Sequence, residues 1–184
     1  MLFNYRHQLN GNPGATKILL RVRIAMLYFG SLSKTMDVSG NIAAVLGQKE
    51  REIFSVAPDA CVDDAVKMMD EKNVGALLVM KGNKLVGMLS ERDYARKVMI
   101  KGKKSYETKV ADIMSTNLSV THPNEGVEEC LRVMTDKRIR HLPVLENDKV
   151  IGVISIGDLV KHVISCQSAT IAHLESYISG GYSG

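Results

Sequence analysis

Two short segments of the chain carry a glycine, a serine and an aspartate at the same spacing. The segments are 87–93 and 152–158, and both read Gly-apolar-x-Ser-x-x-Asp. A glycine lets a ligand approach the backbone without meeting a Cβ atom. A serine at the start of a helix places its hydroxyl beside unpaired N–H groups and the positive end of the helix dipole, which favours a phosphate. The pattern therefore predicts a phosphate-bearing ligand at a strand-to-helix turn.

The serine and the aspartate of each segment also have a purely structural interpretation. Ser-x-x-Asp is a capping box, in which Ser90 or Ser155 caps the helix and Asp93 or Asp158 bonds back to the cap. A carboxylate would repel a phosphate, so its role toward a ligand would be to accept hydrogen bonds from ribose hydroxyls. The two roles can coexist because they use different lone pairs.

The two segments differ in their charged and small neighbours. The first contains Arg92, whose planar guanidinium suits a phosphate, and follows a small-residue strand, Val74-Gly75-Ala76, that leaves room for an adenine. The second has Gly157 where the arginine would fall. We therefore predict that the preferred site lies at the first segment.

These segments occupy matching places in two copies of one unit, because Gly87 and Gly152 are 65 residues apart and many other positions align at the same offset. Apolar residues at helical spacing predict a helix after Pro58 and another after Pro123. In each copy two apolar runs around a polar turn then predict a β-hairpin, and the serine opens a second helix. The predicted strands are 53–56, 74–80 and 85–89 in the first copy and 118–120, 139–145 and 150–154 in the second.

This order predicts an α+β fold of two tandem β-α-β-β-α repeats related by a pseudo-twofold axis. One unit of about 50 residues buries little surface alone, so we expect the two to pack through their sheets and share a core. The predicted parts are an N-terminal, disordered extension (1–37), the first repeat with a lead-in helix (38–109), the second repeat (110–165), and a C-terminal helix and tail (166–184).

Charge and reactive side chains argue against several classes of function. The net charge is +4, but residues 1–36 carry five cations and no acid, so residues 37–184 sum to 4 − 5 = −1. This predicts no nucleic-acid surface, and the apolar run 18–29 is too short and too charged to span a membrane. Residues 1–35 weakly resemble a mitochondrial transit peptide. The predicted location is the cytoplasm, or the mitochondrial matrix if that peptide is genuine.

The cysteines and histidines show no spacing typical of a metal site, and no nucleophile has a nearby base. We therefore predict a protein that is not an enzyme. Two of its three cysteines, Cys61 and Cys130, fall in apolar helical patterns, where a cysteine acts as a small hydrophobe; the third is Cys166.

With both signatures inside a repeat, residues 38–165 resemble the CBS domain family, and 138–144 look like its central strand. The resemblance implies a Bateman module, a pair with clefts for adenosyl ligands such as AMP, ADP, ATP, NAD(H) or S-adenosylmethionine, which commonly forms a homodimer. It makes Arg140 and His141 ligand candidates, with a solvated edge or a dimer contact as the alternative.

The resemblance thus implies a regulatory protein that needs no cofactor for chemistry and signals to an unidentified protein through a conformational or dimer change. Its predicted ligand-binding residues are Ser90, Arg92, Asp93, Val74, Gly75, Ala76, Arg140, His141, Ser155 and Asp158. A dimeric interaction scaffold without a ligand is the alternative.

Overall fold

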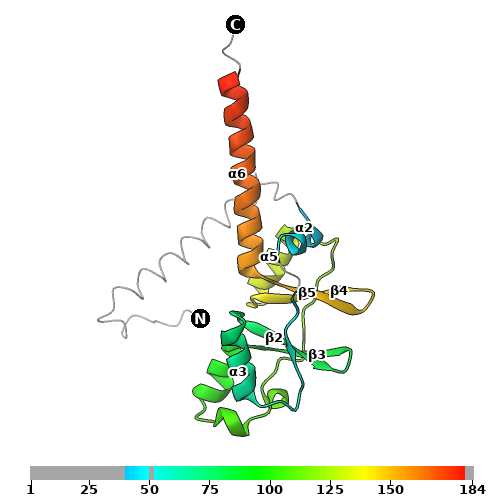
Figure 1. The fold of residues 1–184 in the computed structure, drawn as a ribbon, viewed down its shortest axis with the longest axis vertical. Coiled ribbons are helices and arrows are strands. Elements are labelled where there is room, and N and C mark those ends of the chain that lie inside the picture. The colour runs from blue at the N-terminus through cyan, green and yellow to red at the C-terminus, as the bar shows by residue number, and fades with distance from the viewer. Residues whose placement is uncertain (1–39, 50–51, 181–184) are drawn as a thin grey trace, which may run out of the picture. The chain divides into compact units, whose positions relative to one another are not determined.

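The computed structural model describes residues 40–49 and 52–180, with side chains up to residue 171. The predicted N-terminal extension and the tail after residue 180 lie outside the described residues. Both predicted repeats are present (Figure 1). The first consists of β1 (Ser55–Val56), α3 (Val62–Glu71), β2 (Ala76–Lys81), β3 (Lys84–Ser90), and α4 (Glu91–Tyr94) continued by the π-helix η1 (Ala95–Met99). The second consists of α5 (Val127–Asp136), β4 (His141–Glu146), β5 (Lys149–Ser155) and α6 (Ile156–Gly180). The predicted α+β fold of two repeats is confirmed.

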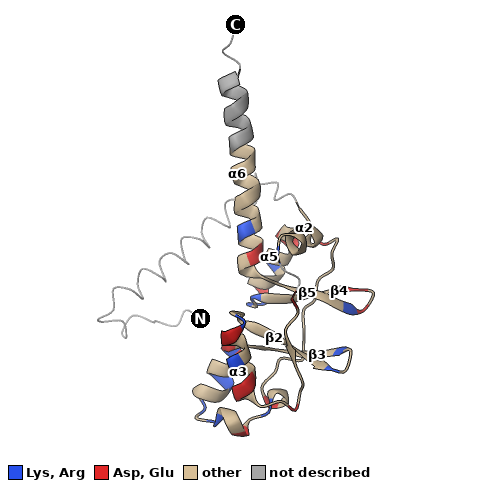
Figure 2. Ribbon diagram, viewed as in Figure 1, with Lys and Arg blue, Asp and Glu red and all other residues tan. Residues whose placement is uncertain are grey.

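The two hairpins have the same register, which confirms the predicted repeat at the level of residue pairs. Leu77 pairs with Leu89 in the first and Leu142 with Ile154 in the second. Each hairpin also contains an irregularity at the same place, after Val79 or after Val144. The tips differ in charge, since lysines end both strands of the first hairpin, whereas the second tip mixes acids and a lysine (Figure 2).

The predicted strand 118–120 is absent from the described residues of the second repeat, where Thr121 alone forms a parallel bridge to Val144. In the first repeat, β1 pairs with β2, and the Leu78 N–H donates to the carbonyl of Phe54 at 3.1 Å. The residue that matches Leu78 is Pro143, which has no N–H to donate. The second ladder therefore loses this hydrogen bond and shrinks to a bridge.

Each repeat has its own hydrophobic cluster, which corrects the expectation of one shared core. The first cluster gathers around α3, β2 and β3, and the second around α5, β4 and β5. Both helices turn an apolar stripe toward the sheet, as the spacing predicts. Cys130 is 2% exposed within the second cluster, which confirms its role as a small hydrophobe.

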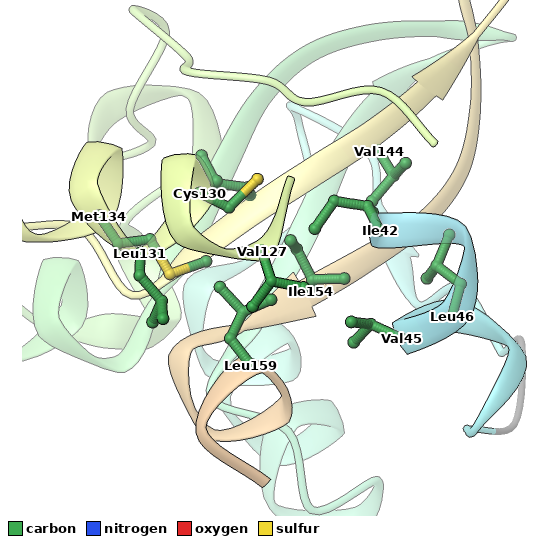
Figure 3. Packing of buried hydrophobic residues seen from close by; sticks show 11 residues of the cluster. Ile42, Val45, Leu46, Val127, Cys130, Leu131, Met134, Val144, Ile154 and Leu159 are labelled. Atoms are coloured by element: carbon green, nitrogen blue, oxygen red, sulfur yellow. The ribbon is translucent and has the colours of Figure 1, made fainter. Parts of the chain in front are cut away.

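The segments that precede the repeats cross over between them. Helix α2 (Ile42–Gly47), which begins at the N-cap Asn41, comes before the first repeat yet buries Ile42, Val45 and Leu46 in the cluster of the second (Figure 3). The short 3-10 helices η2 (Ser105–Glu107) and η3 (Val110–Asp112) lie between the repeats, and Val110 and Ile113 complete the cluster of the first. Each repeat is thus completed by a segment that neighbours the other repeat in sequence.

Helix α6 runs without a break from the second signature through residue 166 to Gly180. Its first turns pack on the second repeat through the buried Leu159, and the helix then continues away from the hairpins (Figure 1). Ile164 and Ile171 are more than half exposed on it, at 57% and 56%. No helix in the described part of the chain is both long and apolar enough to cross a membrane.

Candidate functional site

A cavity of about 210 Å³ lies between the two repeats. Residues from both repeats, and from the segment that joins α2 to β1, line it: Lys49, Glu52, Phe54, Asn73, Val74, Gly75, Ala76, His141, Val153, Ser155 and Asp158. The second signature and the small-residue strand of the first repeat therefore meet at one place, although about 80 residues separate them in sequence.

The first-repeat wall of the cavity is shaped by the end of α3. Asn73 adopts a left-handed conformation, with a φ of 51°, and the Val74 N–H donates to Met69 O at 2.9 Å. This is a Schellman motif, which ends the helix and turns the chain into β2. Gly75 follows, and a Cβ there would lie 3.4 Å from His141 Cε1 and 3.4 Å from a Glu91 carboxylate oxygen. The absence of that atom keeps the wall open between the repeats.

The second-repeat wall is built by the turn from β5 into α6. The Asp158 N–H donates to Ser155 Oγ at 3.1 Å, and the Ser155 N–H donates to Asp158 Oδ2 at 2.8 Å. These reciprocal bonds form the predicted capping box. Lys49 Nζ also donates to Asp158 Oδ2, at 3.0 Å, and to the carbonyl of Val153, at 3.1 Å. The lysine thus joins the α2 segment to the signature of the second repeat.

Two titratable groups of the cavity have shifted pKa values. Burial raises the pKa of Asp158, but the hydrogen bonds from Ser155 and Lys49 outweigh it, so the pKa lies below the usual aspartate value. Burial lowers the pKa of His141, and the neighbouring Arg140 charge lowers it further. At pH 7 the cavity therefore holds an ionised Asp158 and a neutral His141 imidazole.

Residues of the first signature do not line this cavity, although Ser90 pairs with Ala76 and the Glu91 N–H donates to Gly75 O at 3.2 Å. Asp93 Oδ2 accepts from the Ser90 hydroxyl at 2.6 Å and the Ser90 N–H at 3.1 Å, and Asp93 Oδ1 accepts from Lys97 at 2.7 Å and Ser115 at 3.3 Å. All of these donors belong to the protein. The carboxylate is thus fully hydrogen-bonded within the fold, and the capping box is again present.

The predicted cationic side chains also lie off the cavity lining. Arg92 reaches across to the second repeat, where Nη1 donates to the carbonyl of Arg138 at 2.7 Å. Arg140 is exposed and is absent from the lining, although it directly precedes His141. Of the ten predicted residues, six line the cavity, namely Val74, Gly75, Ala76, His141, Ser155 and Asp158, and four do not, namely Ser90, Arg92, Asp93 and Arg140.

A family model described as the CBS domain matches residues 49–100 and 110–165, which together are more than half of the chain. The chain belongs to the CBS domain family. Both CBS repeats seen in the structure are covered, including both signatures.

Known CBS proteins resemble this chain in sequence and in structure. It is 43% identical over 129 residues to the CBS domain-containing protein CBSX3, mitochondrial, of Arabidopsis thaliana; the match covers 67% of this chain and 63% of that protein. A solved CBS-domain structure from Burkholderia ambifaria is 45% identical, with a TM-score of 0.67 over 68% of this chain and 95% of that one. The CBS domain pair of protein MJ0100, solved with 5′-methylthioadenosine and S-adenosyl-L-methionine, shares the fold at 21% identity; its TM-score is 0.59, covering 66% of this chain and 94% of that one.

The cavity between the CBS repeats is also lined by four residues that are not among the predicted ones, namely Lys49, Glu52, Phe54 and Val153. Val153 was accessible to prediction, since it lies two residues before Ser155 on a strand and therefore on the same face. Lys49, Glu52 and Phe54 belong to the segment between α2 and β1, whose pattern carries no sign of the cavity.

The described part of the CBS pair contains no group of three metal-binding side chains. The Cys61 thiol donates to the Ser105 carbonyl at 3.3 Å. Burial raises the pKa of Cys130, which keeps that thiol protonated. These two cysteines have packing roles.

Proposed function

We propose that this CBS pair binds one adenine nucleotide (AMP, ADP, ATP or NAD(H)) per chain in the cavity between its repeats. The observation that carries the proposal is the meeting of Ser155 and Asp158 with the small-residue wall of the first repeat. In this arrangement the ribose hydroxyls donate to Asp158, and the adenine lies along Val74, Gly75 and Ala76. The proposed site thus moves from the first signature to the second.

Hydrogen-bonding capacity supports this assignment. A carboxylate has two acceptor oxygens, and the Ser155 N–H and Lys49 Nζ both donate to Asp158 Oδ2. The Ser155 side chain bonds the same carboxylate, and a ribose hydroxyl bonded to Oδ1 would leave the two Oδ2 bonds intact. The cavity of about 210 Å³ is smaller than the roughly 300 Å³ of the smallest common ligand pockets, so part of a nucleotide would extend from it into solvent.

The hydrogen bonds of the first signature support a single site per chain. All four donors that satisfy Asp93 would compete with a ribose. The signature glycines do not distinguish the two sites, since Met114 Sδ lies 2.6 Å from the place of a Cβ on Gly87 and Leu46 lies 2.8 Å from that of a Cβ on Gly152. We therefore propose that repeat 1 contributes a wall to the site while its own signature serves the fold.

The ligands of MJ0100 support the adenosyl class. That CBS pair was solved with 5′-methylthioadenosine and S-adenosyl-L-methionine, two adenosyl compounds. A site that reads adenine and ribose, and leaves the 5′ substituent to other residues, accommodates such compounds and nucleotides alike.

We propose a regulatory role without catalysis. Both repeats supply walls of the cavity, so a ligand that binds one packing of the repeats more tightly shifts the protein toward it. A partner protein or a second protomer would then respond to that change.

The test is thermal unfolding of the purified protein with and without AMP, ATP, NADH or S-adenosylmethionine. A ligand at 100 times its Kd stabilises the folded state by about 2.7 kcal/mol. For a chain of this size, each kcal/mol raises the midpoint of thermal unfolding by about 2–4 °C. Asp158→Asn should reduce the shift, and Asp93→Asn should keep it. The opposite pattern would place the site at the first signature, and no shift with any of the four compounds would remove the proposal.

The alternative, a ligand-independent dimeric scaffold, is favoured by exposed apolar side chains. Met99, Ile100 and Tyr106 are 63%, 79% and 64% exposed close together in sequence, and Val160 and Ile164 are exposed on α6. Apolar patches of this kind often mark protein contacts. Light scattering after size exclusion, with Ile100→Ser and Ile164→Ser, tests it; a dimer that ligands neither form nor alter would favour the scaffold.

We propose the cytoplasm as the location, with the mitochondrial matrix as the alternative that a transit peptide in residues 1–35 would require. The name of the Arabidopsis relative includes the word mitochondrial, which supports testing that alternative. An import assay with isolated mitochondria distinguishes the two locations, because an imported chain becomes protected from added protease.

A further inference from the structure

Lys49 holds a place in the cavity that its present bonds do not fully explain. It follows α2, yet its ammonium reaches the second repeat and bonds Asp158 Oδ2 at 3.0 Å and the Val153 carbonyl at 3.1 Å. An ammonium carries three N–H donors, and these two contacts use two of them. The side chain is 36% exposed and lines the cavity, so the third donor is available to a ligand.

The charges around Lys49 make it decisive for an anionic ligand. The titratable groups that line the cavity are Lys49, Glu52, His141 and Asp158. Burial and Arg140 lower the pKa of His141, so this side chain is uncharged at pH 7. Lys49 is therefore the one cation among the described lining residues, set against two carboxylates. Without it, the lining would repel an anion.

A further feature marks the same corner of the cavity. It is the start of α6, whose 25 residues direct the positive end of their dipole toward it. Ser155 Oγ accepts from the Asp158 N–H, and the Ser155 side chain also bonds the Asp158 carboxylate. A helix dipole and an ammonium thus meet beside the carboxylate proposed to hold the ribose.

We infer that Lys49 is the specificity-determining residue that selects ligands with an anionic group on the 5′ side of the ribose. The shared chemistry is one phosphate or carboxylate close to the ribose, bound by the third Lys49 donor at the start of α6. This inference rests on the proposed function, since it assumes an adenosyl ligand in this cavity. It goes further because it predicts which adenosyl compounds are rejected.

The experiment compares AMP with adenosine by isothermal titration calorimetry at pH 7. A hydrogen bond to a charged group contributes about 1.5–3 kcal/mol, which is about tenfold or more in affinity. The wild-type protein should therefore prefer AMP by about tenfold or more. Lys49→Met should remove most of this preference by weakening AMP, while adenosine binds as before or more tightly because Asp158 loses a competing donor.

The chain offers a matched control in the first repeat. Lys97 bonds the first signature as Lys49 bonds the second: Nζ lies 2.7 Å from Asp93 Oδ1 and 2.7 Å from the Ile113 carbonyl. Because Lys97 is outside the cavity, Lys97→Met should leave the ratio of AMP to adenosine affinity unchanged. Lys49→Arg retains the charge and should keep a preference for AMP.

The outcomes are distinct. Equal loss of AMP and adenosine affinity in Lys49→Met would overturn the inference, since Lys49 would then only hold Asp158 in place. A wild type that binds both compounds equally would overturn it too, with the proposed function intact. Binding of neither compound, nor of the other adenosyl ligands, would overturn the proposed function and the inference together.

Discussion

The two signatures of this CBS pair share a backbone but differ in surroundings. Both aspartates close a capping box with their serine. Asp93 then receives further donors, a lysine from its own helix and Ser115 from the segment after η3. Asp158 receives Lys49 alone and borders the cavity. A motif can therefore be repeated intact while its two copies lie in different surroundings, only one of them at this cavity.

The difference arises from the segments that cross between the repeats. Leu46 of α2 covers Gly152, and Met114 with Ser115 covers Gly87. Ser115 also forms a backbone bridge to Met88, which draws its hydroxyl to Asp93. The α2 segment instead brings Lys49 to the Val153 carbonyl and to Asp158.

The largest effects should come from changes that break the crossing itself. Ile42 and Ile113 are 0% and 1% exposed, and truncation of such a side chain to alanine costs about 2–5 kcal/mol. Ile42→Ala should lower amide protection from hydrogen exchange mainly in α5, β4 and β5, and Ile113→Ala mainly in α3, β2 and β3. If Ile42→Ala instead lowered protection in α3, β2 and β3, or Ile113→Ala in α5, β4 and β5, the crossing would be contradicted.

The signature glycines should tolerate a methyl group unequally. A Cβ on Gly87 would meet Met114 Sδ at 2.6 Å and the Ser115 backbone oxygen at 3.1 Å, whereas one on Gly152 would meet the mobile end of Leu46 at 2.8 Å. Overpacking costs about 1–3 kcal/mol, and backbone yields less readily than a leucine tip. Urea unfolding should show Gly87→Ala to be the more destabilising; equal midpoints would mean that both sites adapt alike.

A smaller difference in stability is expected from substitutions at the C-terminal ends of α3 and α5. Asn73 and Arg138 occupy the same place with φ values of 51° and 53°. Asparagine adopts this conformation readily, while for most other residues it costs about 1–2 kcal/mol. Arg138→Gly should therefore raise the thermal midpoint, and Asn73→Gly should leave it nearly unchanged. The Arg92 bond is retained, because it uses the Arg138 carbonyl. A decrease for Arg138→Gly would show that its side chain has a further contact.

The smallest expected effect is on the pH dependence of stability, to which His141 and the two aspartates contribute in different pH ranges. The pKa of His141 is lowered by burial and by Arg140, so the unfolded chain takes up a proton before the folded one as pH falls through the normal histidine range. Stability should thus decrease from about pH 7 to pH 5, and His141→Gln should decrease less.

Both aspartates titrate in a lower window. Hydrogen bonds and lysines outweigh burial and lower the pKa of Asp93 and of Asp158. Their contribution is therefore complete above the normal aspartate pKa and is lost only as pH falls below it. Thermal midpoints measured at intervals from pH 7 to pH 3 should show wild type and His141→Gln diverging over the upper part of the range and running parallel below it. Divergence confined to the lower part would assign it to the aspartates.

Local pattern determined most of the secondary structure of this protein. Apolar spacing predicts α3 and α5, the alternation around polar turns predicts both hairpins, and Ser-x-x-Asp predicts both caps, because each depends on residues a few positions apart. The match at an offset of 65 residues also identifies the repeat. The missing hydrogen bond at Pro143 was readable from the sequence as well, since proline has no N–H.

Tertiary structure alone decided which signature faces the cavity. That choice depends on where α2, Lys49, Met114 and Ser115 come to lie, and these contacts join residues far apart in sequence, such as Lys49 and Asp158. A side chain's local sequence records its helix or strand, but not the surface on which that element packs. For this reason the residue types favoured a site at Ser90, Arg92 and Asp93, whereas packing placed Asp158 at the cavity.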